Sequence, residues 1–319
     1  GLRSEKLYYR PKKEREPIDF LSKKKVFFTI SLVLIAAGVI TIGVNAGRGK
    51  GAFAYSLEFQ GGTSTNVTFD KDYSIDEIDK EIVPVVEKVT GDNNVQTQKV
   101  AGTNQVIIKT VTLDLDKREA LNKAMVDNFG VDESKITAEN ISSTVSNEMR
   151  RDAVIAVVIA TICMLLYIWF RFKDIRFATS AVLALLHDVI IVIIFYGVVR
   201  ISVGNTFIAC MLTIVGYSIN ATIVIFDRIR ENLAAGRNKE TLEELVNKSI
   251  TQTVTRSINT SLTTFIMVFV LYLMGVSAIR EFALPLMVGI VCGTYSSVCV
   301  TGALWYVMTT RKKKAAADK

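Results

Sequence analysis

Residues 211–233 read MLTIVGYSINATIVIFDRIRENL, and this stretch passes from apolar to densely charged within one helical length. Its first part is apolar enough for the interior of a bilayer, yet it contains Tyr217, Ser218 and Asn220. Its last part is a charge cluster that begins at Asp227. Because polar groups at bilayer depth are costly, the pattern indicates a membrane helix with a functional polar face that ends at a membrane surface.

The rest of the chain predicts five further membrane helices. A helix needs about 20 apolar residues to cross roughly 30 Å of hydrocarbon. The chain has 319 residues, of which 50% are hydrophobic. The first run is too long for a signal-peptide core and lacks an A-x-A exit, so it is a retained span. We therefore predict an integral membrane protein, an all-α six-helix bundle whose apolar runs are Val26–Ala46, Ala153–Phe170, Phe177–Val199, Ile201–Phe226, Ile258–Gly275 and Phe282–Met308.

The charges are partitioned along the chain and predict its topology. Residues 47–152 hold 13 lysines and arginines against 18 aspartates and glutamates, although the whole chain has a net charge of +7. Basic clusters lie in residues 1–25, 171–176, 228–256 and 311–314. Under the positive-inside rule these clusters are cytoplasmic, so both termini lie inside and the acidic segment lies outside. The basic clusters are topology signals, and no nucleic-acid partner is expected.

This topology divides the chain into five parts. They are a basic tail or linker (1–25), the first span (26–46), an extracytoplasmic α+β domain (47–152), a bundle of five spans (153–310) and a second basic tail (311–319). The chain begins at Gly1 rather than Met, and its polar opening suits either a cytoplasmic tail or a linker from a longer polypeptide.

The outer domain is expected to be a small α+β sandwich of ferredoxin-like type with the order ββαββαβ. Gly61-Gly62 is expected to be a turn between the first two strands, and Ser74 is expected to cap a helix together with Glu77. The domain contains no histidine, cysteine or phosphate-cradling loop, so it is either a binding or lever module or a folded spacer. The predicted elements are strands at 53–59 and 64–69, a helix at 74–89, a hairpin of 94–100 and 104–111, a helix at 114–129 and a strand at 135–141.

Two groups of polar residues in the spans are candidates for ion coupling. His187, the only histidine, precedes Asp188 near the middle of the third span. A buried histidine is often only hydrogen-bonded packing, but an imidazole beside a carboxylate also suits proton handling. In the fourth span, Thr213, Tyr217, Asn220 and Asp227 recur at three- or four-residue steps or multiples of them, and so share one face.

The fifth and sixth spans carry two further patterns. Arg256 shares a face with Asn259, Thr260 and Thr263, and is either a snorkelling anchor or a cation that faces the bundle interior; the surrounding polar residues favour the interior. Small residues recur every fourth position in the sixth span, which is typical of close helix packing, either within the bundle or against a partner. These residues are Gly289, Gly293, Ser297 and Thr301.

The chain shows no sign of enzymatic chemistry. The four cysteines, Cys163, Cys210, Cys292 and Cys299, all lie in predicted spans and are interpreted as apolar side chains without disulfide or metal-ligand spacing. No nucleophile–base pair or nucleotide loop is visible. We predict no cofactor, no metal and no enzymatic activity.

Several motifs resemble the SecF family of bacterial protein export. They run in family order over about residues 26–310 and comprise LEFQGGTSTNV (57–67, with Gly61, Gly62 and Thr63), SNEMRRDAV (146–154), LLHDVIIV (185–192), the stretch at 211–233 and SITQTVTRSINTSLTT (249–264). The resemblance implies half of a resistance–nodulation–division (RND) type fold in the bacterial cytoplasmic membrane. It implies the partner SecD, separate or fused, a SecYEG-type channel, an unfolded preprotein substrate and surrounding lipid. It also implies that the proton-motive force helps to draw preproteins outward.

The resemblance also assigns two positions and leaves one question open. The family's membrane arginine corresponds to Arg256, whereas the position of its proton-linked aspartate is Ala221. Alanine carries no proton. Either the SecD half supplies the only carboxylate, or His187 and Asp188 substitute, or coupling uses another ion or is lost. We favour the first option as a hypothesis.

Two other functions remain as alternatives. A passive scaffold or assembly factor of the translocon is made more credible by Ala221. An exporter of small molecules or lipids from the same superfamily would usually need a larger outer domain than the roughly 100 residues here.

Overall fold

The computed structural model describes residues 16–48, 51–92, 95–100, 102–172, 174–236, 240–275 and 277–317. The predicted tail up to residue 15 lies outside these ranges. Within them, six helices are long and apolar enough to cross a membrane, which confirms the six predicted spans. They are α1 (Lys24–Gly47), α6 (Ser143–Phe172), α7 (Ile175–Val199), α8 (Asn205–Ala234), α9 (Leu242–Met274) and the composite of α10 (Ser277–Tyr295), η4 (Ser296–Thr301) and α11 (Gly302–Ala317).

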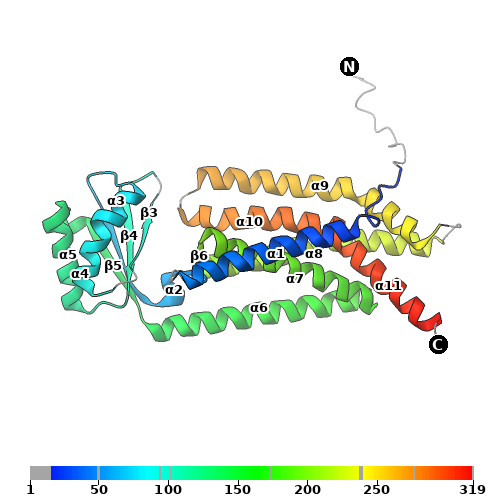
Figure 1. Ribbon diagram of the computed structural model, residues 1–319, viewed down its shortest axis with the longest axis horizontal. Helices are drawn as coiled ribbons and strands as arrows, with labels where there is room; N and C mark the ends of the chain where they lie inside the picture. The colour runs from blue at the N-terminus through cyan, green and yellow to red at the C-terminus, as the bar shows by residue number, and fades with distance from the viewer. Residues whose placement is uncertain are drawn as a thin grey trace, which may run out of the picture.

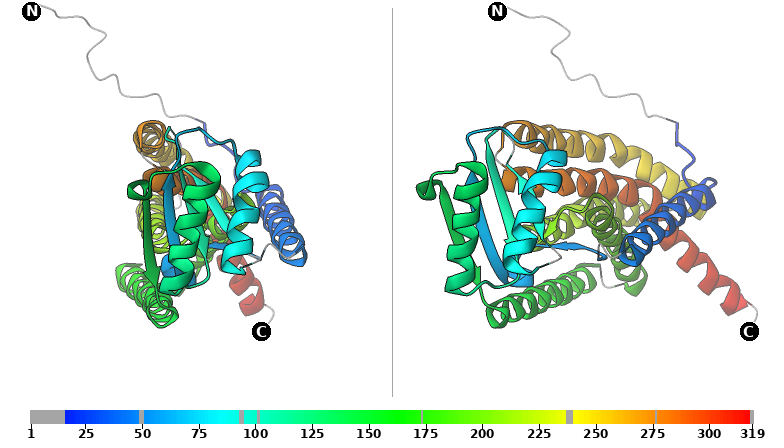
Figure 2. Two further views of the ribbon diagram at one scale, coloured as in Figure 1. Left: turned by 90° about the vertical axis from the view of Figure 1, so that its left-hand side faces the viewer. Right: turned by 60° about the vertical axis from the view of Figure 1, so that its left-hand side comes forward.

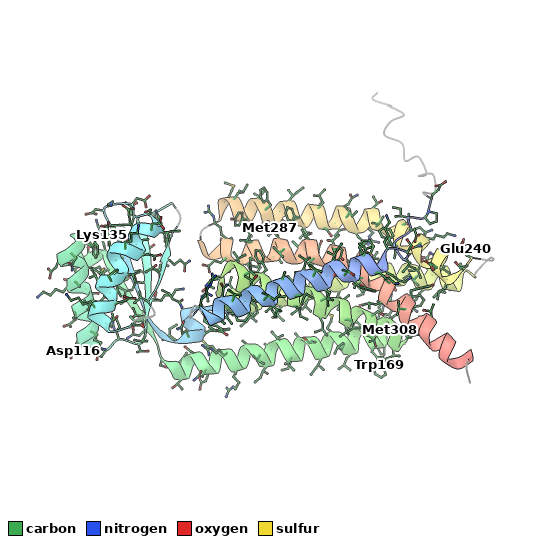
Figure 3. The ribbon with its side chains drawn as sticks, viewed as in Figure 1. Asp116, Lys135, Trp169, Glu240, Met287 and Met308 are labelled. Atoms are coloured by element: carbon green, nitrogen blue, oxygen red, sulfur yellow. The ribbon has the colours of Figure 1, made fainter. Side chains whose placement is uncertain are left out.

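The six helices run side by side with the α+β domain at one end (Figure 1). The start of α1 and the end of α11 both lie at the end away from this domain (Figure 1). Trp169, which is 60% exposed, points outward from α6 near that same end (Figure 3). The sixth helix contains Pro285 and then passes through the π-helical turn η4, so it is not a regular α-helix along its length.

Local sequence signals set the helix ends. The Asp174 side chain accepts a hydrogen bond from the Arg176 N–H at the start of α7. Thr241 and Glu244 form a reciprocal capping box at the start of α9. Arg200 ends α7 with a left-handed φ of 60°. These caps set where the helices begin and end. They therefore also set how far each polar residue lies from the helix ends.

The outer domain contains a four-stranded antiparallel sheet in the order β3-β4-β2-β5. Its strands are β2 (Gly62–Thr68), β3 (Gln96–Lys99), β4 (Gln105–Thr110) and β5 (Ile136–Ile141). One connection contains α3 (Ile75–Glu77), η2 (Ile78–Ile82) and α4 (Val83–Thr90), and the other contains α5 (Leu115–Phe129) and η3 (Glu133–Lys135). The predicted hairpin, both predicted helices and the last strand are confirmed.

The helices α4 and α5 of the outer domain cover one face of this sheet, and the membrane bundle lies beyond the other face. Figures 1 and 2 show α4 and α5 on the side of the sheet that faces away from the bundle. Alternate residues of β4 are buried, as expected for a strand with one core face. The core between sheet and helices includes Val67, Ile78, Ile82, Val86, Ile108, Leu121 and Met125.

The first predicted strand is wrong in its extent and its partner. Only β1 (Ala54–Tyr55) is extended, and it pairs in parallel with β6 (Ser202–Val203), which joins α7 to α8. The residues that follow form the short helix α2 (Leu57–Gln60). Gly61 and Gly62 have φ values of +73° and +127° and turn the chain from α2 into β2, so they are not a hairpin turn. β1 therefore belongs to a separate two-stranded sheet with the connection between α7 and α8, and not to the four-stranded sheet of the domain.

Further contacts join the domain to the bundle. The Gln98 amide on β3 donates to the Glu281 carboxylate on α10 at 2.7 Å. The Arg200 guanidinium donates to the Gly51 carbonyl at 3.0 Å. Both contacts lie at the bundle end where the domain sits, next to a polar cavity of about 280 Å³.

Candidate functional site

Asp188 is the centre of a buried polar cluster in the middle of the bundle. Its side chain is fully buried, and α7 places it where α8 and the sixth helix converge. Ser218 of α8 and Ser296 of η4 donate their hydroxyls to Asp188 Oδ2 at 2.5 and 2.7 Å. His187 Nδ1 lies 3.0 Å from Oδ1, and the Cys292 thiol donates to the same oxygen at 3.3 Å. Both carboxylate oxygens are therefore fully engaged.

Hydrogen bonds of this kind make a buried carboxylate tolerable. A charge in an apolar bundle is costly unless it is paired and hydrogen-bonded, and hydrogen bonds to charged groups contribute about 1.5–3 kcal/mol each. Asp188 receives such bonds from three separate helical segments. The cluster therefore ties α7, α8 and the sixth helix together as well as holding an ionisable group.

The small residues of the sixth helix allow this close approach. A Cβ added at Gly289 would lie 2.4 Å from Ile214 Cδ1, and one at Gly293 would lie 3.2 Å from Ser218 Cβ. Ser297 donates to the Gly293 carbonyl and lies 3.3 Å from the Thr222 hydroxyl of α8. This stripe therefore packs against α8 inside the chain.

A second polar group lies between α8 and α9. A small cavity of about 90 Å³ is lined by residues of α8 and α9, namely Tyr217, Asn220, Ala221, Val224, Arg256, Ser257, Thr260 and Ser261. Asn220, Arg256 and Thr260 are exposed in this chain, whereas Ser218 is buried against Asp188. The sequence-based grouping of Ser218 with Tyr217 and Asn220 is therefore wrong, because the helix turns Ser218 inward.

Arg256 lies on this uncovered face and not in the core of the chain's own bundle. Within the described ranges it forms no ion pair with an aspartate or glutamate. Ala221 lies beside it and offers no charge. A cation on the membrane-spanning part of a helix needs an anionic or polar partner.

Asp227, the other predicted carboxylate, belongs to a surface ion pair. It lies 2.9 Å from Arg171 of α6 and 3.9 Å from Arg230, and its side chain is 40% exposed. The structure therefore brings Tyr217, Asn220 and Arg256 together, and separately brings His187 and Asp188 together, but Asp227 joins neither group.

The sequence did not single out two residues of the buried cluster, Ser296 and Cys292. Cys292 was interpreted as an apolar side chain, but its thiol contacts both Asp188 and His187. Its contact partners lie more than one hundred positions away in the sequence, so no local spacing could reveal them. The partial signal was its place one position before Gly293 in the small-residue stripe.

The Gly61-Gly62-Thr63 motif holds the outer domain together at the start of β2. The Thr63 hydroxyl donates to Asn140 Oδ1 of β5 and accepts a hydrogen bond from the Leu113 N–H at 2.8 Å. Thr63 is fully buried. The motif is thus a structural link between the sheet and the segment before α5.

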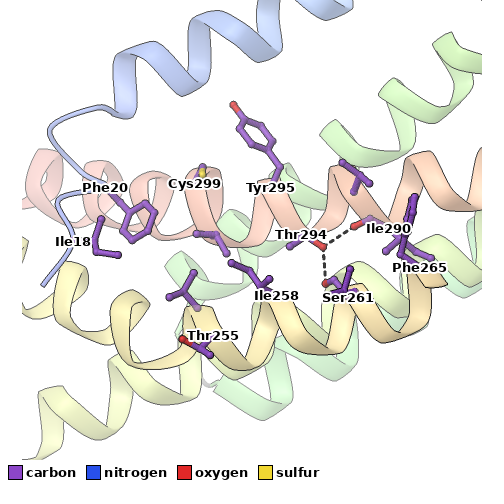
Figure 4. Close-up of a pocket in the computed structure, with 14 residues that line it drawn as sticks. Ile18, Phe20, Thr255, Ile258, Ser261, Phe265, Ile290, Thr294, Tyr295 and Cys299 are labelled. Atoms are coloured by element: carbon purple, nitrogen blue, oxygen red, sulfur yellow. Dashed lines mark hydrogen bonds between the residues drawn. The ribbon is translucent and has the colours of Figure 1, made fainter. Parts of the chain in front are cut away.

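A larger, mostly apolar cavity lies next to the Arg256 cavity and shares Ser261 with it. It has a volume of about 770 Å³, lies between α9 and α10, and is closed at one end by Ile18 and Phe20 (Figure 4). Among its polar groups, the Thr294 hydroxyl lies within hydrogen-bond distance of both Ser261 Oγ and the Ile290 carbonyl (Figure 4). The remaining walls are mostly apolar, so this groove has no evident chemistry.

Comparison with known proteins places this architecture in a family. Residues 121–311 match the family described as "Protein export membrane protein SecD/SecF, C-terminal". The chain belongs to the SecD/SecF family. It is 37% identical over 303 residues to the protein translocase subunit SecF of Petrotoga mobilis, covering 93% of this chain and 98% of that protein. It is 34% identical to the protein translocase subunit SecDF of Bacillus subtilis, covering 93% of this chain and 39% of that protein.

A solved structure of the SecD/SecF family agrees with the fold. The crystal structure of SecDF, a translocon-associated membrane protein from Thermus thermophilus, is 31% identical with a TM-score of 0.78. The match covers 92% of this chain and 39% of the SecDF chain. The chain therefore spans about two fifths of a SecDF protein and nearly the whole of a separate SecF.

Proposed function

We propose that this SecD/SecF family chain is a SecF-like accessory subunit of the Sec protein translocase. It assists ion-gradient-driven export of preproteins across the bacterial cytoplasmic membrane, together with SecD and a SecYEG-type channel. Its termini are cytoplasmic, and its outer domain, of ferredoxin-like type, lies on the other side. It performs no covalent chemistry.

The uncovered polar face around Arg256 carries this proposal. Asn220, Arg256 and Thr260 are exposed, and they lie on helices that cross the membrane. The Thr260 hydroxyl donates to the Arg256 carbonyl within α9, but lipid tails offer no hydrogen bonds to the Asn220 and Arg256 side chains. A second protein surface with polar groups would cover these two side chains. The SecDF relatives, in which this chain corresponds to two fifths of a longer protein, support SecD as that surface.

Because Ala221 carries no carboxylate, the group that takes up the proton must lie elsewhere. The chain offers Arg256 without an anionic partner among its described residues, and the position beside it carries no carboxylate. A SecD carboxylate that approaches this cavity would pair with Arg256 when ionised and leave it when protonated. We therefore assign the titrating group to the SecD half.

The experiment is gradient-driven preprotein translocation into vesicles that contain the channel, SecD and this chain. Arg256→Gln should abolish most of the stimulation by an imposed pH gradient, because the cation that stabilises the ionised partner is lost. Arg228→Gln is the matched control, since Arg228 is a basic residue of α8 held by Glu231 and Gln252. It should leave the stimulation unchanged, and Ala221→Asp should add little.

A scaffold without coupling is the second candidate, and Ala221 is the observation that favours it. Equal stimulation in the native and Arg256→Gln vesicles, or stimulation only after Ala221→Asp, would support the scaffold and overturn the coupling role.

A further inference from the structure

We propose that His187, Asp188 and Cys292 form a binding site for a divalent transition-metal ion such as Zn²⁺. The site is separate from the group on which the proposed function rests, because it shares no residue with the Arg256 cavity. It combines an imidazole nitrogen, a carboxylate oxygen and a thiol sulfur, one atom from each side chain, all within 4.8 Å of one another.

The distances between these atoms suit a shared metal ion. His187 Nδ1 and Asp188 Oδ1 are 3.0 Å apart, Asp188 Oδ1 and Cys292 Sγ are 3.3 Å apart, and Cys292 Sγ and His187 Nδ1 are 3.9 Å apart. Tetrahedral zinc with ordinary bond lengths places such ligand atoms about 3.3–3.6 Å from one another. Shifts of a few tenths of an ångström would therefore bring all three atoms onto one ion.

The charges of the site also balance. Binding would release the thiol proton of Cys292, so the thiolate and the Asp188 carboxylate together neutralise a divalent cation. His187 would bind through Nδ1 as the neutral imidazole and keep its proton on Nε2. His187 Nε2 is buried without a hydrogen-bond partner among the described residues even without a metal. Metal binding at Nδ1 therefore breaks no hydrogen bond of Nε2. An uncharged complex is the form that a bundle interior tolerates best.

The surroundings hold the carboxylate in position for a metal. Ser218 and Ser296 donate to Oδ2, which leaves Oδ1 directed toward His187 and Cys292. Hydrogen bonds of this kind orient ligands and are often worth 10–100-fold or so in metal affinity. His187 and Cys292 also line a cavity of about 530 Å³ whose other walls are mainly apolar, for example Ile191 and Met287. The attraction between a cation and its ligands is stronger in such a setting than in water.

The test is metal binding to the untagged full chain, purified in detergent under non-thiol reducing conditions. Co²⁺ is the spectroscopic probe, because a thiolate ligand gives an intense near-ultraviolet charge-transfer band. We expect this band to saturate at one Co²⁺ per chain and to disappear on addition of Zn²⁺. Zn²⁺ should also raise the melting temperature of the chain.

Two cysteine variants make the assignment specific. Cys292→Ser should lose the charge-transfer band and weaken Zn²⁺ binding about tenfold or more. Cys299→Ser is the matched control, a half-buried cysteine seven residues further along the same helix, and should bind as the native chain does. Absence of the band from the native chain overturns the proposal without any variant. Equal loss in both variants, or retention of the band in Cys292→Ser, also overturns it.

Discussion

At the scale of single residues, the two polar groups of the bundle differ in kind. Asp188 is closed, because the hydroxyls of Ser218 and Ser296 and the thiol of Cys292 donate to it, and His187 Nδ1 lies 3.0 Å from Oδ1. Arg256 is open, because its guanidinium has no carboxylate partner in the described part of the chain. The cluster around Asp188 stabilises helix packing, and it can bind a metal ion only if it releases a proton. The Arg256 guanidinium can still pair with a carboxylate of another protein, and for this reason coupling is assigned to the Arg256 face.

Glu77 offers a residue-scale prediction in the outer domain. Its pKa is lowered from 4.5 to about 2, first by the hydrogen bond from Lys71 and then by those from the backbone and side chain of Ser74. Because the pKa is lowered in the folded state, the stabilisation is present above pH 4.5 and is lost as the pH falls toward about 2. Amide hydrogen exchange at α3, corrected for intrinsic rates, should therefore quicken over this window.

The Glu77 prediction has a matched control. Glu77→Gln should show faster exchange already at neutral pH and a weaker acid dependence than the native chain. Glu119→Gln changes an exposed glutamate of α5 and should leave α3 unaffected. An identical acid dependence in the native and Glu77→Gln chains would contradict the assignment.

At the scale of elements, the contact between α8 and α10 depends on Gly289. A Cβ at this position would meet Ile214 at 2.4 Å, so Gly289→Ala forces the two helices apart or distorts Ile214. Overpacking of this kind costs about 1–3 kcal/mol. We expect Gly289→Ala to lower the melting temperature of the detergent-solubilised chain, measured by thermal unfolding.

Gly216 provides the control for this prediction. It lies on α8 with nothing within 4 Å of an added Cβ, so Gly216→Ala should be neutral or stabilise the helix by up to about 1 kcal/mol. If both alanine variants unfold alike, the close approach of α10 to α8 does not govern stability.

The elements could be predicted from the sequence where the signal is local. Long apolar runs fixed the number of spans, and Ser74 with Glu77 marked a helix start, because hydrophobic length and capping act over a few residues. The pairing of Ala54–Tyr55 with Ser202–Val203 was missed because two-residue strands carry no periodicity. The contact of Cys292 with Asp188 was missed because it joins two helices, α10 and α7, whose contacting residues are 104 positions apart.

The candidate site was predicted only in part, because helical spacing is also a local signal. Helical spacing grouped Tyr217 with Asn220, and that grouping lines one cavity with Arg256. Spacing did not reveal that Ser218 points into the bundle, where its hydroxyl donates to Asp188 of α7. Which side of a membrane helix faces its own bundle depends on all its neighbours.

At the scale of the whole molecule, the chain leaves the polar face of α8 and α9 around Arg256 uncovered, and lipid tails cannot form hydrogen bonds with such a face. Gly216 lies on this face and has open space around it. Gly216→Leu should leave the melting temperature of the isolated chain nearly unchanged. It should reduce co-purification with SecD about tenfold or more, because a large side chain would meet the partner where glycine allows close helix approach.

The control for this assembly prediction is another glycine in open space. Gly43 of α1 is also exposed with nothing within 4 Å of an added Cβ, so Gly43→Leu adds the same bulk to a different face. It should co-purify with SecD as the native chain does. If Gly216→Leu assembles equally well, the partner does not cover this face, and Arg256 must find its counter-charge elsewhere. Loss of assembly in Gly216→Leu alone would place the SecD half against the cavity that contains Ala221, where a partner carboxylate is needed for coupling.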